Sequence, residues 1–180
     1  MVNPPFLPSR RPLLLLAVTF AVVVSAPTER LAAQDEANGV LAAGLAEAAS
    51  TDRLVFLHFG APWCGWCARL ERWLVREDIA PIFSRDFVAV KVDVDEMPGG
   101  QEMLESYAGR NVGIPWLIIL RPDGTRLADS DAPNGQNIGS PIAEWEIDHW
   151  NTMMRASVRR ITEEEILYMA ETWAEDRGGS

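Results

Sequence analysis

Two cysteines constrain this 180-residue sequence more than any other feature, because they are its only ones and only two residues separate them. Cys64 and Cys67 stand in FGAPWCGWCARLERWL, between an apolar, strand-like run at 53–60 and a run over 64–76 with helical spacing. Such a pair can be a redox couple, half of a metal site or a structural staple. A staple this short would close almost no loop and would stabilise the fold little through loop entropy.

A zinc site is the second alternative, and the composition disfavours it. Structural zinc sites use about four ligands. The sequence adds only His58 and His149 to the two cysteines, so one zinc site would consume all of these residues. We therefore favour a redox pair formed by protein side chains alone, with no metal and no other cofactor.

The first 33 residues differ in composition from the rest of the chain. A pair of arginines precedes the 15-residue apolar run 12–26, which is shorter than the roughly 20 residues of a comfortable membrane span. This order is typical of an export signal. We expect residues 1–33 to be a signal peptide cleaved near Ala33, which leaves a domain over 34–180, and an uncleaved membrane anchor is the alternative. The protein would then be periplasmic or secreted, where disulfides persist.

The charge of the chain limits its partners. The formal net charge is −10, and Lys91 is the only lysine. This acidic balance argues against nucleic acid and against anionic membrane surfaces as partners. With 48% hydrophobic residues, the chain can form a sizeable core. We expect a monomer that meets the membrane only through its export signal.

The rest of the sequence predicts alternating helices and strands. The predicted helices are 37–49, 64–76, 99–110, about 143–158 and 162–175, with a less regular helical stretch at 78–83. The predicted strands are 53–60, 87–95, 115–120 and 125–130. A helix between the first two strands makes them parallel, whereas the turn RPDG makes the last two an antiparallel hairpin. We expect an α/β fold with a mixed central sheet flanked by helices, and a helical extension from about residue 143.

Three finer predictions concern the helices. The predicted helix over 64–76 places Trp73 on its core face and Arg69 and Glu71 outside that face. Trp145 is predicted to anchor the C-terminal helices to the core, together with the two later tryptophans. The last helix begins with TEEE at 162–165, which is typical of a capping box.

The segment from about Leu54 to Ser130 resembles the thioredoxin superfamily. FGAPWCGWC resembles its active-site segment, and GIPW at 113–116 resembles its cis-proline loop. More narrowly, the chain is similar to exported bacterial proteins of this family with a loop like SDAPNGQNIGSP before extra C-terminal helices. The resemblance implies a thioredoxin-like fold and a thiol–disulfide oxidoreductase. Its partners would be protein thiols and disulfides and an unidentified electron donor or acceptor. A substrate-binding or chaperone-like module that uses the proline groove without turnover is the rival hypothesis.

The two cysteines then take different roles. A helix N-terminus stabilises a thiolate, so we expect Cys64 to be the reachable nucleophile. Cys67, one turn further on, would be the buried resolving thiol. Gly65 allows a tight backbone turn between them. Trp63 and Trp66 would form an apolar rim that binds substrate, although packing against the fold is an alternative for Trp63.

The proline loop supplies the other half of the predicted site. The resemblance implies a cis bond between Ile114 and Pro115, which would expose the backbone of Ile114 beside Cys64. A substrate chain could pair with that backbone as an added strand. We therefore assign Pro115 to the catalytic site, and Ile114 and Trp116 to the substrate-binding surface.

His58 is where the sequence departs from the family. It stands six residues before Cys64, where thioredoxins carry a buried acid that helps to deprotonate the resolving thiol. Lys91 falls where they carry the lysine partner of that acid. Two cations are not buried together, so we expect a neutral His58 with Lys91 in support. The imidazole would either accept a proton from Cys67 or be a core histidine bonded to backbone.

Overall fold

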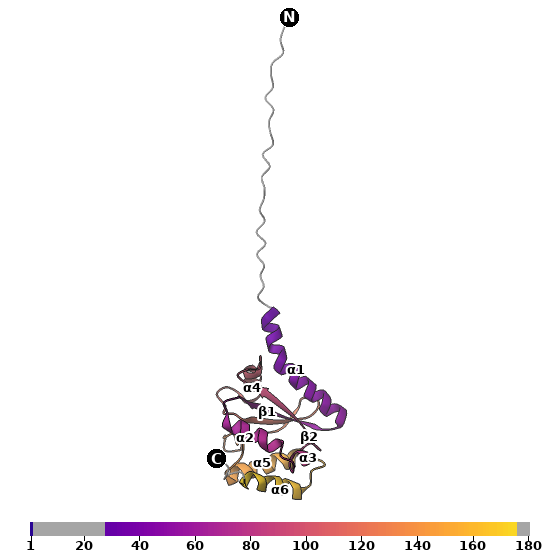
Figure 1. Ribbon diagram of the computed structural model, residues 1–180, viewed down its shortest axis with the longest axis vertical. Coiled ribbons are helices and arrows are strands. Elements are labelled where there is room, and N and C mark those ends of the chain that lie inside the picture. The colour runs from indigo at the N-terminus through magenta and orange to yellow at the C-terminus, as the bar shows by residue number, and fades with distance from the viewer. Residues whose placement is uncertain (2–27, 176–180) are drawn as a thin grey trace.

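The computed structural model describes Met1 and residues 28–175, with side chains described from residue 36 onward (Figure 1). The apolar run 12–26 of the predicted signal peptide lies outside the described residues. The predicted cleavage point near Ala33 falls within the first helix, α1. Over residues 28–175, no helix is both long and apolar enough to cross a membrane.

The elements follow the predicted order, with shifts at their ends. They are α1 (Thr28–Thr51), β1 (Leu54–Gly60), α2 (Gly65–Leu74), α3 (Ala80–Phe83), β2 (Phe87–Asp93), α4 (Gly100–Ala108), β3 (Trp116–Leu120), β4 (Arg126–Asp129), α5 (Glu144–Ser157) and α6 (Glu163–Glu175). The first helix begins earlier than its Ala/Leu-rich core predicted. The capping box of α6 is confirmed, since Thr162 and Glu165 bond each other's backbone N–H groups.

A single four-stranded sheet of order β2-β1-β3-β4 forms the centre of the fold. Strands β1 and β2 are parallel, and β3 and β4 form an antiparallel hairpin, which confirms both predicted pairings. The pairing of β3 with β1 is antiparallel and makes the sheet mixed. All seven residues of β1 are buried, because helices cover both faces of this central strand. The fold is thioredoxin-like.

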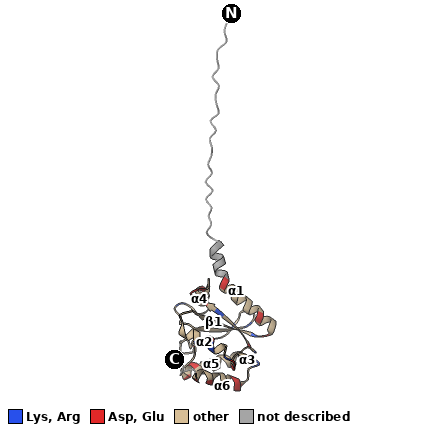
Figure 2. Ribbon diagram, viewed as in Figure 1, with Lys and Arg blue, Asp and Glu red and all other residues tan. Residues whose placement is uncertain are grey.

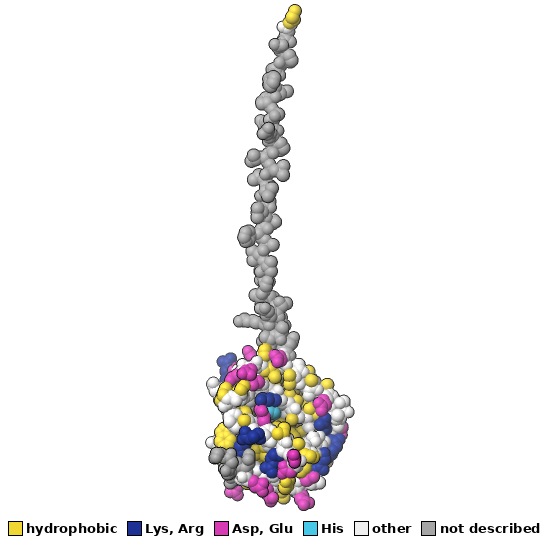
Figure 3. Space-filling view, viewed as in Figure 1, with side chains coloured by type: hydrophobic (Ala, Val, Ile, Leu, Met, Phe, Trp, Pro, Cys, Tyr) yellow, Lys and Arg dark blue, Asp and Glu magenta, His cyan; other side chains and the backbone are white. Residues whose placement is uncertain are grey.

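The helices divide between the two faces of the sheet (Figure 1). Helices α1 and α4 cover one face, where Leu41 and Leu104 pack against alternate residues of β1 such as Leu57. Helices α2, α3, α5 and α6 cover the other face, where Trp73 and Trp150 pack against Phe56. On the outer surface, acidic and basic side chains are interspersed (Figures 2 and 3).

Three tryptophans fasten the C-terminal helices to α2. Trp73 of α2 stacks on Trp173 of α6 with 4.2 Å between the ring centroids, and it meets Trp150 of α5 edge to face at 5.3 Å. Each of these three side chains is at most 1% exposed. Trp145, in contrast, is 38% exposed. Its prediction as a core anchor was wrong, because Trp145, the second residue of α5, is not among the buried residues of that helix.

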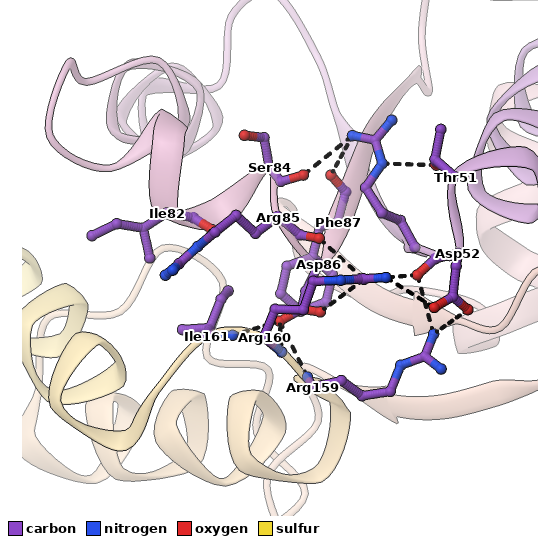
Figure 4. A network of polar contacts seen from close by, with 11 residues as sticks. Thr51, Asp52, Ile82, Ser84, Arg85, Asp86, Phe87, Arg159, Arg160 and Ile161 are labelled. Atoms are coloured by element: carbon purple, nitrogen blue, oxygen red, sulfur yellow. Dashed lines mark hydrogen bonds and ion pairs between the residues drawn. The ribbon is translucent and has the colours of Figure 1, made fainter.

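A buried carboxylate joins the α5–α6 connection to the start of β2 (Figure 4). Asp86 is 2% exposed, and its Oδ2 atom accepts the backbone N–H groups of Arg159, Arg160 and Ile161 at 2.8–3.1 Å. The side chains of both arginines also pair with Asp52, just before β1. This network holds the α5–α6 connection against the edge of the domain at which β1 and β2 begin.

Candidate active site

The cysteines lie where β1 ends and α2 begins. Cys64 is the N-cap residue of α2, Cys67 lies in its first turn, and a disulfide joins them with 5.2 Å between the Cα atoms. The backbone N–H of Cys67 donates to Sγ of Cys64 at 3.1 Å. An N–H group aimed at a sulfur on a helix N-terminus stabilises negative charge on that sulfur. In this disulfide form, Cys64 is 5% exposed and Cys67 1%.

A strand glycine lets α2 approach the sheet closely at this point. A Cβ atom added to Gly60 would lie 3.1 Å from Cβ and 3.2 Å from Sγ of Cys67, which is closer than ordinary van der Waals contact. Any larger residue would push the helix and its cysteine away from β1. Gly60 was not predicted as a site residue, although its place at the strand end just before the cysteines was a usable signal.

The proline loop lies directly against the disulfide. The Ile114–Pro115 bond is cis, as the resemblance implied, and the carbonyl oxygen of Ile114 lies 3.6 Å from Sγ of Cys64. The side chain of Asn137 donates to the carbonyl oxygens of Gly113 and Pro115 at 2.8 and 2.9 Å. Asn137 therefore fixes the backbone on both sides of Ile114, a role that the sequence analysis missed.

Two of the three predicted tryptophans of the substrate surface are accessible. Trp63 is 72% exposed and bonds Asp95 through its indole N–H, and Trp66 is 52% exposed. Trp116 is a correction, because it is fully buried. It packs on the α1/α4 face of the sheet and donates its indole N–H to Asp131 at 3.1 Å. A substrate on the molecular surface has no access to this ring.

His58 lies under α2, on the α2/α5/α6 face of β1. It is 4% exposed, and burial lowers its pKa to about 4; Glu71 opposes this shift and Lys91 adds to it. The expected neutral state is thus favoured chiefly by burial and only in smaller part by Lys91. In the described part of the chain, Nδ1 of His58 is buried without a hydrogen-bond partner. Nδ1 therefore makes no hydrogen bond to backbone in the described residues.

Lys91 lies opposite His58 in the β1–β2 register, but its ionic partner is an acid that the sequence analysis missed. Its Nζ atom lies 2.7 Å from a carboxylate oxygen of Glu71. Glu71 follows Cys67 by four residues, so the two share one side of α2. This spacing was the available signal, and it places a carboxylate within reach of both the lysine and the histidine.

Arg69 of α2 is a further correction, since it was predicted outside the core face and is 5% exposed. Its guanidinium donates to the carbonyl oxygens of Ser140, Pro141 and Trp173 at 2.9–3.2 Å, and it lies over the Trp173 ring. The sequence pattern misplaced Arg69 because α6 covers a second stripe of α2. The arginine thereby connects the cysteine helix, the loop before α5 and the last helix.

Comparison with known proteins agrees with this geometry. The sequence model of the family described as Thioredoxin-like matches residues 36–122. The chain is also 35% identical over 80 residues to Thioredoxin-1 of Drosophila melanogaster, which covers 44% of this chain and 67% of that protein. The chain belongs to the thioredoxin-like family. With its Cys64–Cys67 pair, this thioredoxin-like protein is a thiol–disulfide oxidoreductase.

Solved structures are similar over larger parts of the chain. A disulphide isomerase from Xylella fastidiosa aligns with a TM-score of 0.49 and 20% identity, over 78% of this chain and 90% of that one. The oxidised C-terminal domain of DsbD from Neisseria meningitidis aligns with a TM-score of 0.41 and 26% identity, over 51% and 79%. The family match ends at residue 122, so β4, the loop after it, α5 and α6 lie beyond the matched region.

Proposed function

We propose that this protein is exported and exchanges disulfides with protein substrates, with Cys64 as the attacking thiol and Cys67 as the resolving thiol. The observation that carries the proposal is the position of Cys64 at the N-cap of α2, where the backbone N–H of Cys67 points at its sulfur. The thiolate is the attacking species in thiol–disulfide exchange. A donor held at 3.1 Å favours that species at Cys64.

The reaction proceeds in two exchanges. The Cys64 thiolate attacks one sulfur of a substrate disulfide, forms a mixed disulfide and releases the other substrate sulfur as a thiolate. Cys67 then attacks Sγ of Cys64, which forms the Cys64–Cys67 disulfide and releases the second substrate thiolate. The substrate gains two electrons and the protein loses two. The same steps run backwards when the protein oxidises a substrate dithiol.

His58 serves the second exchange as the proton acceptor. Cys67 lies within the helix and must lose a proton before it attacks, and the buried imidazole beneath α2 is neutral and has an unpartnered nitrogen. Lys91 supports this state because its charge disfavours a charged imidazole, whereas the Glu71 carboxylate paired with Lys91 favours the imidazolium that forms once the proton is accepted. Substrate backbone docks beside Ile114, next to Cys64.

The trapping of mixed disulfides tests the proposal. Cys67→Ser should accumulate disulfide-linked partners through Cys64, because no thiol remains to resolve them, and Cys64→Ser is the matched control that should trap few. An insulin-reduction assay on the wild type separates turnover from binding alone. A wild-type protein that binds reduced and oxidised insulin without reducing the disulfides would favour the rival substrate-binding module.

Export is the part of the proposal that rests on the N-terminal sequence. The arginine pair, the apolar run 12–26 and the small residues ending at Ala33 support a cleaved signal. Expression of the full chain in a bacterium, followed by mass determination of the periplasmic protein, tests it. A mass that corresponds to residues 34–180 is the expected result. Full-length protein in the membrane fraction would favour the uncleaved anchor.

A further inference from the structure

A cavity of about 470 Å³ opens beside the cysteine pair. Its lining comes from Trp66, from segment 113–115 of the proline loop, from residues 137–140 and 142–143, and from Glu146 of α5. A substrate strand that pairs with Ile114 therefore passes this cavity while its sulfur is at Cys64. The wall formed by residues 137–146 lies beyond the part of the chain that the family model matches, which ends at residue 122.

The wall of the cavity is held in place by side chains from three elements. Asn137 bonds the proline loop on one side and accepts the N–H of Gly139 on its other atom. Arg69, buried in α2, binds the carbonyl oxygens of Ser140 and Pro141. Oε2 of Glu146 accepts the N–H groups of Ile142 and Ala143 at 2.7 and 2.8 Å. A wall fixed at so many points is preorganised, which lowers the entropic cost of binding.

The lining combines apolar surface with polar groups, which include the side chains of Asn137 and Ser140. Trp66, Ile114, Pro115 and Ile142 supply aromatic and aliphatic surface. Glu146 supplies a carboxylate, and among the described residues that line the cavity it is the only charged one. This combination matches a lysine or arginine side chain, whose stem packs on apolar surface while its head meets an anion. The half-exposed Trp66 ring can also receive the cation on its face.

From these observations we infer that the cavity is a specificity pocket for a basic side chain close to the reacting cysteine of the substrate polypeptide. The inference rests on the proposed function and adds the class of substrate. It also assigns a purpose to the C-terminal extension: α5 supplies Glu146, and α6 secures Arg69 through the carbonyl of Trp173.

Single-cysteine peptides test the pocket directly. Each peptide carries its cysteine as a mixed disulfide with the coloured thiol 5-thio-2-nitrobenzoate, and the residues within two positions of the cysteine are Ala, Arg, Leu or Glu. Pre-reduced protein releases the coloured thiol when Cys64 attacks the peptide sulfur, and stopped-flow absorbance gives the second-order rate constant. The Arg peptide should react about fivefold to tenfold faster than the Ala peptide, as one half-buried ion pair and a cation–π contact support. The Glu peptide should react more slowly than Ala.

Glu146→Gln is the decisive variant, because its amide oxygen can still accept the N–H groups of Ile142 and Ala143 while the charge is removed. The ratio of the Arg rate to the Ala rate should then fall to near one. Glu144→Gln makes the same charge change on an exposed position of the same helix and should keep the wild-type ratio.

The outcomes separate the two proposals. If the wild-type protein releases the coloured thiol from no peptide, the proposed function fails. If it reacts with all peptides at equal rates, or with Leu at least as fast as with Arg, the basic-substrate inference is overturned while the proposed function stands. Loss of the Arg preference in both variants would attribute it to net charge rather than to the pocket, and would also overturn the inference.

Discussion

Acidification should destabilise this protein through one buried histidine. In the unfolded chain the pKa of His58 has its ordinary value of 6.5, whereas burial lowers it to about 4 in the folded protein. Between these two values the unfolded chain binds a proton that the folded protein does not, so acid favours unfolding. The contribution is nearly absent above pH 7, grows as the pH falls below 6.5 and stops growing below about 4.

The size of this effect follows from the window between the two pKa values. Each pH unit inside the window lowers the free energy of unfolding by about 1.4 kcal/mol for one proton. From pH 6.5 down to about pH 4.5 the loss is therefore about 2–3 kcal/mol. His58 is almost fully buried, so solvent screening does not reduce the value substantially. For a domain of this size, such a loss is a large fraction of the total stability.

Chemical denaturation of the oxidised protein at about pH 7.5 and about pH 4.5 measures this loss. His58→Gln removes the titrating group, so its free energy of unfolding should fall less than that of the wild type, by about 2–3 kcal/mol. Carboxylates that titrate in acid contribute to both proteins and cancel in the comparison. His149→Gln is the control; His149 is half-buried on α5 and bonds the Asp129 carbonyl, and its replacement leaves His58 in place.

An equal acid loss in wild type and His58→Gln would refute the reasoning. It would mean that His58 binds its proton as readily in the folded protein as in the unfolded chain. The imidazole would then be charged at mildly acidic pH, and burial beneath α2 would not control its state.

Three further outcomes are expected. In stopped-flow resolution of a preformed Cys64 mixed disulfide, His58→Gln should slow attack by Cys67 by roughly 10²-fold or more while the first exchange stays nearly unchanged; superimposable pH profiles would leave His58 as packing only. Asp86→Ala should lower the free energy of unfolding by about 3–5 kcal/mol, because three backbone N–H groups and Arg160 lose a buried acceptor. Denaturant titration measures this loss, and a loss under about 1 kcal/mol would contradict the prediction. Reduction should raise tryptophan emission because the disulfide quenches nearby indoles, and Trp66→Phe should diminish the rise; an emission spectrum that ignores redox state would place neither exposed ring near the sulfurs.

The sequence predicted the sheet well because local patterns determine strands strongly. Alternation and β-branched residues located β1 and β2, and the Asp-Gly turn at 121–124 fixed the hairpin that follows. The antiparallel pairing of β3 with β1 was not predicted. No local pattern encodes it, because the connection from β2 to β3 passes through α4 and a long loop that permit either direction.

The errors concern residues whose surroundings come from distant parts of the chain. Arg69 lies off the apolar stripe of α2, and only the packing of α6 and the loop at 140–141 buries it. Trp116 begins a strand beside the active site, but the alternation of β3 turns its ring to the opposite face. Trp145 is aromatic like the buried Trp150 of the same helix, yet its side chain remains partly exposed. Each case needs the tertiary arrangement, which a single helix or strand pattern does not contain.

The charged groups near the resolving cysteine stand at positions that differ from those implied by the family resemblance. The family resemblance implies an acid at position 58 with a lysine at position 91. Here the buried position holds a neutral imidazole, and the carboxylate stands on α2 as Glu71, paired with Lys91 at the half-exposed edge. A buried carboxylic acid acts as a base only in its ionised form, and that form is disfavoured by burial. His58, in contrast, is uncharged before it accepts a proton. The imidazolium formed when Cys67 loses its proton would lie close to the Glu71 carboxylate, which favours that charge. In the proposed mechanism, the group that accepts the Cys67 proton is therefore a neutral imidazole rather than a buried carboxylate.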